Sequence, residues 1–150
     1  MGKILAVIAS GFGLGYVPFA PGTAGSLLAI PIWLLCVNYA VSWPIYLLIT
    51  VILIGIGLLA CAEGERRWGH DPGRVVIDEV AGQWLTLLIA GQSGIGWLIA
   101  AFVLFRLFDI WKPGPVDKLQ NLPGAWGVMC DDLLAGVFGG IILLIASMLI

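Results

Sequence analysis

Long apolar stretches separated by short polar connections dominate the chain, and no charged residue occurs between positions 4 and 62. A helix needs about 20 apolar residues to cross the hydrocarbon core of a bilayer. The stretches 26–41, 44–62 and 133–150 approach that length. Two shorter ones, 80–90 and 95–108, are joined by the turn at 91–94, so we expect them to form a helical hairpin. The pattern therefore predicts about five membrane helices.

The N-terminal stretch, residues 3–20, is apolar but differs from the others. It is interrupted by Gly11, Gly13, Gly15 and Pro18, which favour breaks rather than one continuous helix. We expect a re-entrant or interfacial segment here. The predicted fold class is all-α: a polytopic membrane helical bundle of about five helices, in a single domain covering residues 1–150.

Composition agrees with a membrane protein. Of the residues, 61% are hydrophobic and 11% are charged, and the mean hydropathy is +1.07. Ordinary soluble domains carry about 25% charged residues. The chain has no basic run that would bind a nucleic acid backbone, so we expect the lipid bilayer as its surroundings and no nucleic acid partner. The sequence indicates no particular protein partner.

The basic residues fix the orientation of the predicted helices. If five helices alternate in direction, all seven Lys and Arg residues fall on one side, and the turns at 42–44 and 91–94 carry no charge. Membrane proteins keep such residues in the cytoplasm. We therefore predict that this side is cytoplasmic.

Acidic residues gather at the same face. The pair Asp78-Glu79 begins one predicted helix, Asp109 ends the next, and the pair Asp131-Asp132 begins the last. Ionisable groups at the edge of a membrane are costly unless they are paired, hydrated or bound to a cation. A single acid would merely complement the positive end of a helix dipole. Two adjacent pairs repel each other, so we favour a metal site. Carboxylate oxygens are the ligands that Mg²⁺ prefers.

Two further motifs suggest phosphate binding. Arg106 and Lys112 flank Asp109 on one helix face, although an ion pair for Arg106 and simple interfacial placement for Lys112 would also explain them. Gly22, Thr23 and Ser26 lie at a glycine-rich helix start, where backbone N–H groups bind anions; helix capping by Thr23 or Ser26 is the alternative. The single histidine, His70, lies in a polar loop. We expect it to be loop structure, with acid–base chemistry as the weaker alternative.

Four ordered motifs between residues 11 and 140 resemble the bacterial phosphatidylglycerophosphatase A family. They are GFGLG at 11–15 with APGTAGS at 20–26, VIDE at 76–79 with Gly82, FRLFD at 105–109 with KPGP at 112–115, and DD at 131–132 with AG at 135–136. The resemblance implies an integral-membrane, Mg²⁺-dependent lipid phosphatase of the bacterial inner membrane. Its substrate would be phosphatidylglycerophosphate and its product phosphatidylglycerol, within glycerophospholipid biosynthesis.

From the chemistry of the residues we assign expected roles within that activity. The catalytic candidates are Asp78, Glu79, Asp109 and Asp132; the metal ligands are these four and Asp131; the phosphate-binding candidates are Arg106, Lys112, Gly22, Thr23 and Ser26. Two nucleophiles for attack on the phosphorus stay open: a water molecule and one of the aspartates. A membrane cation or proton transporter is the alternative function. It fits less well, because transporters bind their ions near the bilayer midplane.

Overall fold

The computed structural model describes residues 1–149, and this part of the chain contains helices and no strand. The expected all-α fold is therefore confirmed. In chain order the elements are α1 (Gly2–Ala9), the 3₁₀ helix η1 (Leu14–Tyr16), α2 (Pro21–Asn38), α3 (Trp43–Trp68), α4 (Ile77–Ala90), α5 (Ile95–Trp111), α6 (Pro115–Leu119) and α7 (Ala125–Leu149).

Three helices, α2, α3 and α7, are long and apolar enough to cross a membrane. The 14 residues of α4 span ~21 Å at about 1.5 Å per residue, which is less than the ~30 Å of a hydrocarbon core. Most of α4 is instead buried by its neighbours. On α3, large apolar side chains such as Leu48, Val51 and Leu59 are more than half exposed. Exposed apolar surface on this scale suits contact with lipid tails.

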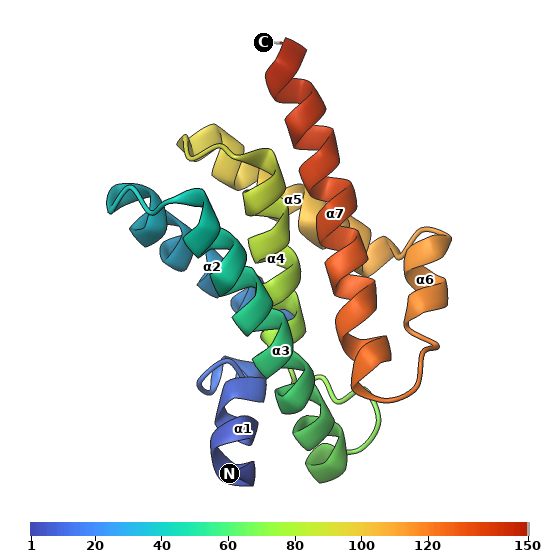
Figure 1. The fold of residues 1–150 in the computed structure, drawn as a ribbon. Helices are drawn as coiled ribbons and strands as arrows, with labels where there is room; N and C mark the ends of the chain where they lie inside the picture. The colour runs from blue at the N-terminus through green and yellow to red at the C-terminus, as the bar shows by residue number, and fades with distance from the viewer. Residues whose placement is uncertain (150) are drawn as a thin grey trace.

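The five longest helices, α2, α3, α4, α5 and α7, alternate in direction, and α4 lies at their centre (Figure 1). It packs most extensively against α7 and then against α2, while α5 also packs against α7. The turns at 39–42 and 91–94 lie in the upper half of the molecule in Figure 1, as does the last part of α7. The N-terminus and the loops at 69–76 and 120–124 lie at the lower end. The helix α1 packs against α3 near that end.

Three local features differ from the sequence-based expectation. The helix α7 begins at Ala125, so Asp131 and Asp132 lie in its second turn rather than at its start. The helix α2 begins at Pro21, and neither Thr23 nor Ser26 caps it. Ser26 instead donates a hydrogen bond to the carbonyl oxygen of Gly22 one turn earlier, at 2.8 Å. The short helix α6 was not predicted, because five residues carry too little periodicity to be recognised.

Small residues allow α4 and α7 to approach closely, as the sequence predicted for Gly82 and Gly136. A β-carbon added at Gly136 would collide with the carbonyl oxygen of Gly82. The hydroxyl of Thr86 donates to the carbonyl oxygens of both Gly82 and Gly136, at 3.1 Å each. Close backbone contact of this kind stabilises helix pairs in membranes. The contact also brings the acidic parts of the two helices together.

The Gly136→Ala variant should therefore lose stability. Its new methyl group would meet backbone atoms that cannot rotate away, and overpacking of this kind costs about 1–3 kcal/mol. Gly96→Ala in α5 is the matched control, because an added β-carbon there meets no atom within 4 Å. We expect thermal unfolding in detergent, followed by circular dichroism, to show a lower Tm for Gly136→Ala only. Equal Tm values for the two variants would contradict the close packing.

Candidate active site

The glycine-rich N-terminal motif holds in place the segment that leads into α4. A β-carbon added at Gly25 would lie 2.8 Å from Val76, and one added at Gly15 would collide with the carbonyl oxygen of Arg74. The backbone N–H of Val76 also donates to the carbonyl oxygen of Ala9, at 2.8 Å. Sequence analysis expected the glycines of residues 21–26 to let the backbone approach a ligand, and Gly15 to interrupt the N-terminal segment. In the structure, Gly15 and Gly25 let the backbone approach residues 74–76.

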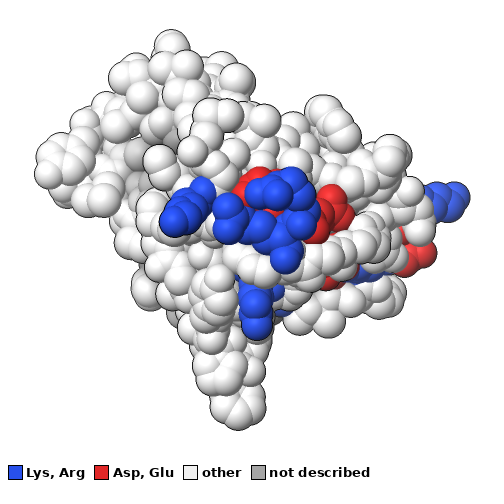
Figure 2. All heavy atoms as spheres, turned by 90° about the horizontal axis from the view of Figure 1, so that it is seen from below, with Lys and Arg blue, Asp and Glu red and all other residues white. Residues whose placement is uncertain are grey.

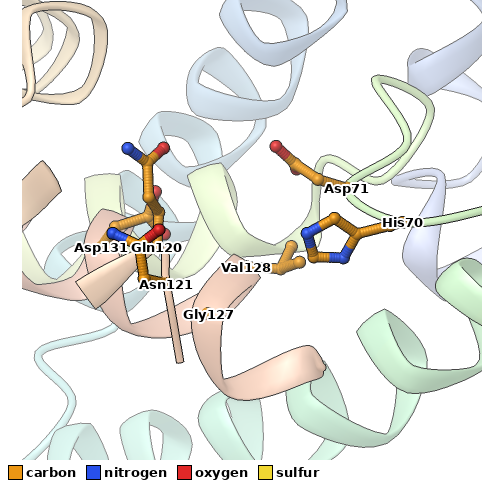
Figure 3. A pocket seen from close by; sticks show the side chains of 7 residues that line it. All are labelled: His70, Asp71, Gln120, Asn121, Gly127, Val128 and Asp131. Atoms are coloured by element: carbon orange, nitrogen blue, oxygen red, sulfur yellow. The ribbon is translucent and has the colours of Figure 1, made fainter. Parts of the chain in front are cut away.

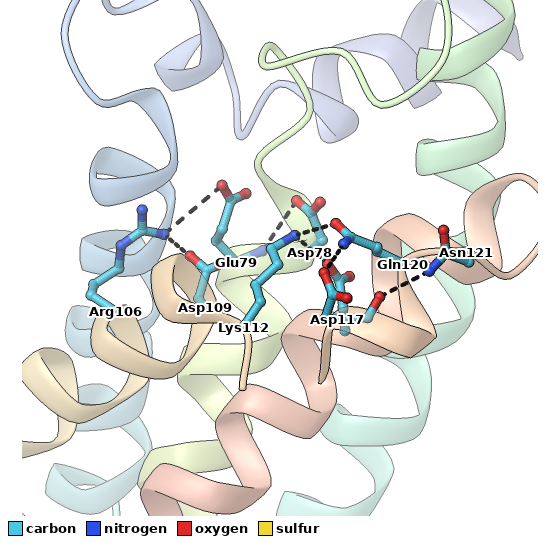
Figure 4. Close-up of polar contacts among 9 residues, drawn as sticks. Asp78, Glu79, Arg106, Asp109, Lys112, Asp117, Gln120 and Asn121 are labelled. Carbon is cyan, nitrogen blue, oxygen red and sulfur yellow. Dashed lines mark hydrogen bonds and ion pairs between the residues drawn. The ribbon is translucent and has the colours of Figure 1, made fainter. Parts of the chain in front are cut away.

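That segment delivers two carboxylates to the first turn of α4, where they meet a third from α7. Asp78, Glu79 and Asp132 each offer an oxygen, and these oxygens lie within 4.8 Å of one another. Asp78 and Asp132 are buried, and Figure 4 shows Asp78 and Glu79 at the start of α4. No other group of three such residues lies this close in the part of the chain that the structure describes. We call Asp78, Glu79 and Asp132 the carboxylate cluster.

Arg106 borders the cluster from α5. One of its terminal nitrogens, Nη1, pairs with Asp109 and lies 4.0 Å from Glu79 Oε1 (Figure 4). The same nitrogen lies 3.5 Å from the hydroxyl of Ser26. Gly22 lies against the side chains of Glu79 and Arg106. A β-carbon there would collide with Glu79 Oε1 and lie 3.1 Å from Arg106 Nη1. The start of α2 therefore reaches the cluster only because residue 22 has no side chain.

Lys112 follows α5 directly and pairs with Asp131, the residue next to Asp132 of the cluster. Its ammonium donates to Asp131 Oδ2 at 2.5 Å and to Gln120 Oε1 at 3.4 Å. Burial alone would lower the pKa of Lys112, but the hydrogen bond and negative charge of Asp131 outweigh it and raise the pKa above its usual value. The backbone of Lys112 is left-handed, with φ of +47°. Such backbone strain in a non-glycine residue is often found at functional sites.

Several buried polar atoms around the cluster have no protein partner. They include Glu79 Oε2, Arg106 Nε, Asp131 Oδ1 and both side-chain polar atoms of Gln83. An unpaired buried polar atom costs about 1–3 kcal/mol, so these atoms are suited to a ligand or an ordered water. Gln83 is fully buried and lies one turn after Glu79 on the same helix. Sequence analysis missed it, although a polar amide within an apolar segment was a usable signal.

The structure thus brings together most of the residues proposed from sequence, in three groups. The carboxylate cluster forms the centre, Asp109 pairs with Arg106, and Asp131 pairs with Lys112. Thr23 lies in the first turn of α2, beside Gly22. His70 is exposed and lies 2.7 Å from Glu65 Oε1 through its Nδ1 atom.

These charges share one end of the bundle. Viewed from below, Lys, Arg, Asp and Glu side chains gather in the middle of that face (Figure 2). A membrane helix bundle with buried carboxylates beside an arginine and a lysine indicates a class of protein: a membrane protein with a site suited to a divalent metal and to phosphate. The donors of the cluster fit such a metal, because all three are carboxylates whose oxygens lie within 4.8 Å of one another.

Comparison with known proteins places the chain more closely. The family model for phosphatidylglycerophosphatase A matches residues 7–147. The chain is 41% identical to phosphatidylglycerophosphatase A of Escherichia coli, over 91% of this chain and 80% of the relative. It is 35% identical to phosphatidylglycerophosphatase A of Haemophilus influenzae, over 91% and 84%. The chain therefore belongs to the phosphatidylglycerophosphatase A family and is a membrane phosphatase, as its motifs indicated.

A third relative carries a different name. The chain is 45% identical to a putative phosphatidylinositol-3-phosphatase of Bacteroides thetaiotaomicron, over 96% of this chain and 94% of the relative. No solved structure matches the chain. All three relatives are named as phosphatases of phospholipids, so the comparisons do not favour the transporter alternative.

Proposed function

We propose that this chain hydrolyses the terminal phosphate of phosphatidylglycerophosphate, giving phosphatidylglycerol and inorganic phosphate in glycerophospholipid biosynthesis. Residues 1–150 would act as one integral-membrane phosphatase domain. The observation that carries the proposal is the carboxylate cluster in a chain of this family, with Arg106 4.0 Å from Glu79 and with Lys112 paired to Asp131, the neighbour of Asp132. Release of phosphate from this lipid by the purified protein is the experiment that tests it.

The carboxylate cluster is proposed to hold Mg²⁺. Its donors are all carboxylate oxygens, and Glu79 Oε2 is buried without a protein partner. Magnesium prefers such ligands and commonly shares them with substrate phosphates. When bound, the ion would neutralise negative charge on the phosphate. Asp109 and Asp131 also stay proposed ligands. Their ion pairs with Arg106 and Lys112 support a second role for them, which is to position those two cations.

The phosphate oxygens are proposed to lie between Arg106, Lys112 and the start of α2. Arg106 has a buried Nε atom without a partner, so its guanidinium has donor capacity left for an anion. The backbone N–H of Gly22 lies at a helix N-terminus, which favours negative charge. The N–H of Thr23 already donates to the carbonyl oxygen of Ala20, at 3.0 Å, so Thr23 would contribute its hydroxyl. Ser26 stays a proposed part of this site through Arg106: its hydroxyl donates to the carbonyl oxygen of Gly22, and its oxygen would orient Arg106 by accepting from Nη1. These groups would stabilise the charge that develops as the phosphorus–oxygen bond breaks.

Two nucleophiles are compatible with this arrangement. In one route, a carboxylate of the cluster takes a proton from a water molecule as that water attacks phosphorus, and then gives this proton to the departing lipid alkoxide. In the other, an aspartate among Asp78, Asp109 and Asp132 attacks phosphorus directly, and water then cleaves the aspartyl phosphate. Both routes release one lipid alcohol and one inorganic phosphate.

Arg106→Lys tests the arginine's role. Lysine keeps the positive charge but lacks the planar fork that binds two oxygens at once. We expect kcat/KM for phosphatidylglycerophosphate to fall by roughly 10-fold or more, the equivalent of about 1.4 kcal/mol. Lys112→Arg should be milder than Lys112→Ala, because Lys112 acts mainly as a charge. Normal kinetics for Arg106→Lys would show that a point charge is enough at position 106.

We further propose that the chain lies in the bacterial inner membrane with the carboxylate cluster on the cytoplasmic face, as the positive-inside pattern supports. In a background without native cysteines, Asp71→Cys and Lys118→Cys should react with a membrane-impermeant thiol reagent only from the cytoplasmic side. Ser93→Cys should react only from the opposite side. Labelling of positions 71 and 93 from the same side would refute this orientation.

Phosphatidylinositol 3-phosphate is a second candidate substrate. It is favoured by the 45% identity to the Bacteroides relative, which exceeds the identity to either phosphatidylglycerophosphatase A. Both lipids carry a phosphomonoester on a hydroxylated headgroup, so the same cluster would serve either one. Assaying the purified chain with each lipid in the same micelles would rank them by kcat/KM.

A further inference from the structure

A polar cavity of about 170 Å³ opens beside the carboxylate cluster. Its walls come from three separate parts of the chain. His70 and Asp71 belong to the loop before α4, Gln120 and Asn121 follow α6, and Asp131 belongs to α7 (Figure 3). In Figure 3, His70 and Asp71 lie on one side and the other three polar side chains lie opposite. None of the roles proposed above uses this space.

The cavity adjoins the phosphate site through one ion pair. Lys112 donates to Asp131 Oδ2, while the other oxygen of that carboxylate, Oδ1, is buried without a partner. Gln120 also accepts from Lys112. A group that enters the cavity would therefore lie next to a phosphate held by Lys112.

Hydrogen-bond acceptors dominate the lining. The amide nitrogen of Asn121 is used, since it donates to the carbonyl oxygen of Asp117 at 3.1 Å, and this leaves the side-chain oxygen of Asn121. His70 contacts Glu65 through Nδ1, which leaves the Nε2 atom of the ring. Asp131 Oδ1 and the carboxylate of Asp71 are further acceptors.

This lining excludes two kinds of ligand. A phosphate would be repelled, because the cavity has two carboxylates and neither Lys nor Arg in its lining. A metal ion also fits poorly. Among the described residues, only the carboxylate cluster brings three acidic, histidine or cysteine side chains within ligand distance of one another. Neutral hydroxyl groups fit well, because each can donate to a carboxylate or amide oxygen and accept from a ring nitrogen.

We propose that this cavity binds the hydroxyl-bearing headgroup that joins the scissile phosphate to the rest of the lipid. The proposal rests on the lipid phosphatase function proposed above and names the part of the substrate that is read. A volume of about 170 Å³ equals that of roughly five to six waters at about 30 Å³ each, which suits a small polyol fragment. Phosphatidic acid, whose phosphate is attached directly to diacylglycerol, has nothing to place in the cavity.

The test compares headgroup-bearing and headgroup-free substrates. Purified full-length protein in detergent micelles is assayed with phosphatidylglycerophosphate, phosphatidylinositol 3-phosphate and phosphatidic acid. The variants are Asn121→Ala and Asp71→Asn. The second keeps the shape of the side chain and suits the left-handed backbone at position 71, where φ is +43°. Asn38→Ala, an exposed position at the far end of α2, is the matched control.

We expect the wild-type protein to prefer a headgroup-bearing lipid over phosphatidic acid. Asn121→Ala removes an acceptor, and Asp71→Asn replaces a charged acceptor by a weaker neutral one. Each should lower kcat/KM for that lipid by roughly 5-fold or more. Their rates on phosphatidic acid should stay near wild type, and Asn38→Ala should match wild type throughout.

Three results would overturn headgroup binding and leave the phosphatase function standing, two of them from the variants and one from the wild-type protein. One is an equal loss on all lipids for both variants, and another is no loss on any lipid. A wild-type protein that hydrolyses phosphatidic acid as well as the other lipids would do the same. A wild-type protein that hydrolyses none of them would overturn the proposed function itself, and the headgroup proposal with it.

Discussion

Replacing either buried aspartate of the carboxylate cluster should nearly abolish phosphate release. Asp78→Asn and Asp132→Asn keep the size of the side chain but remove a negative charge from a site with oxygens within 4.8 Å of one another. Loss of one metal ligand or one catalytic carboxylate should lower kcat by roughly 10²-fold or more. The measurement is steady-state release of inorganic phosphate from phosphatidylglycerophosphate micelles.

This result is informative only for folded variants. Both aspartates are buried, so each variant needs the same helical content and a Tm close to that of the wild-type protein. Correctly folded variants that keep near-normal turnover would show that the cluster serves assembly of the helices. The enzymatic assignment would then depend on family membership alone.

Removing divalent metal should have an effect of similar size. Three carboxylates lie together, and the nearest cation, Arg106, is 4.0 Å from Glu79 and already paired with Asp109. Without an added cation, the cluster places negative charge where a phosphate dianion would have to bind. The carboxylates and the phosphate would then repel each other. We expect a chelator to reduce activity to background and added Mg²⁺ to restore it.

The choice of ion is part of the same experiment. Oxygen-only ligands favour Mg²⁺ or Mn²⁺ over softer metals. Activity should therefore return with either of these ions. Full activity in a buffer treated to remove all divalent ions would rule out the metal role of the cluster.

The membrane helices and their convergence could be predicted from sequence because both depend on simple patterns. Apolar length identified the helices, and the alternation of their directions followed from the placement of the basic residues. Gly82 and Gly136 were recognised as contact points, because small residues in equivalent places on two helices favour close packing. From that contact it followed that Asp78 and Asp132 would meet.

The remaining features depend on contacts between distant parts of the chain. The pairing of Lys112 with Asp131 and the cavity beside it require α6 and the loop before α4 to come together, which no local pattern specifies. Helix α7 began earlier than predicted, because residues 125–130 are a mixture that hydropathy alone does not assign. The packing of Gly15 and Gly25 against residues 74–76 could not be predicted either, because these residues are far apart in the sequence.

The most direct test of the central claim compares two glutamates in one assay. Glu79→Gln alters the carboxylate cluster, whereas Glu63→Gln alters a carboxylate paired with Arg66 and Arg67 at the end of α3. The rate of phosphate release from phosphatidylglycerophosphate is measured for both variants and for the wild-type protein at saturating Mg²⁺. We predict turnover by the wild type and by Glu63→Gln, and a rate near background for Glu79→Gln. Equal rates for the two folded variants, or no release by the wild type, would contradict the account.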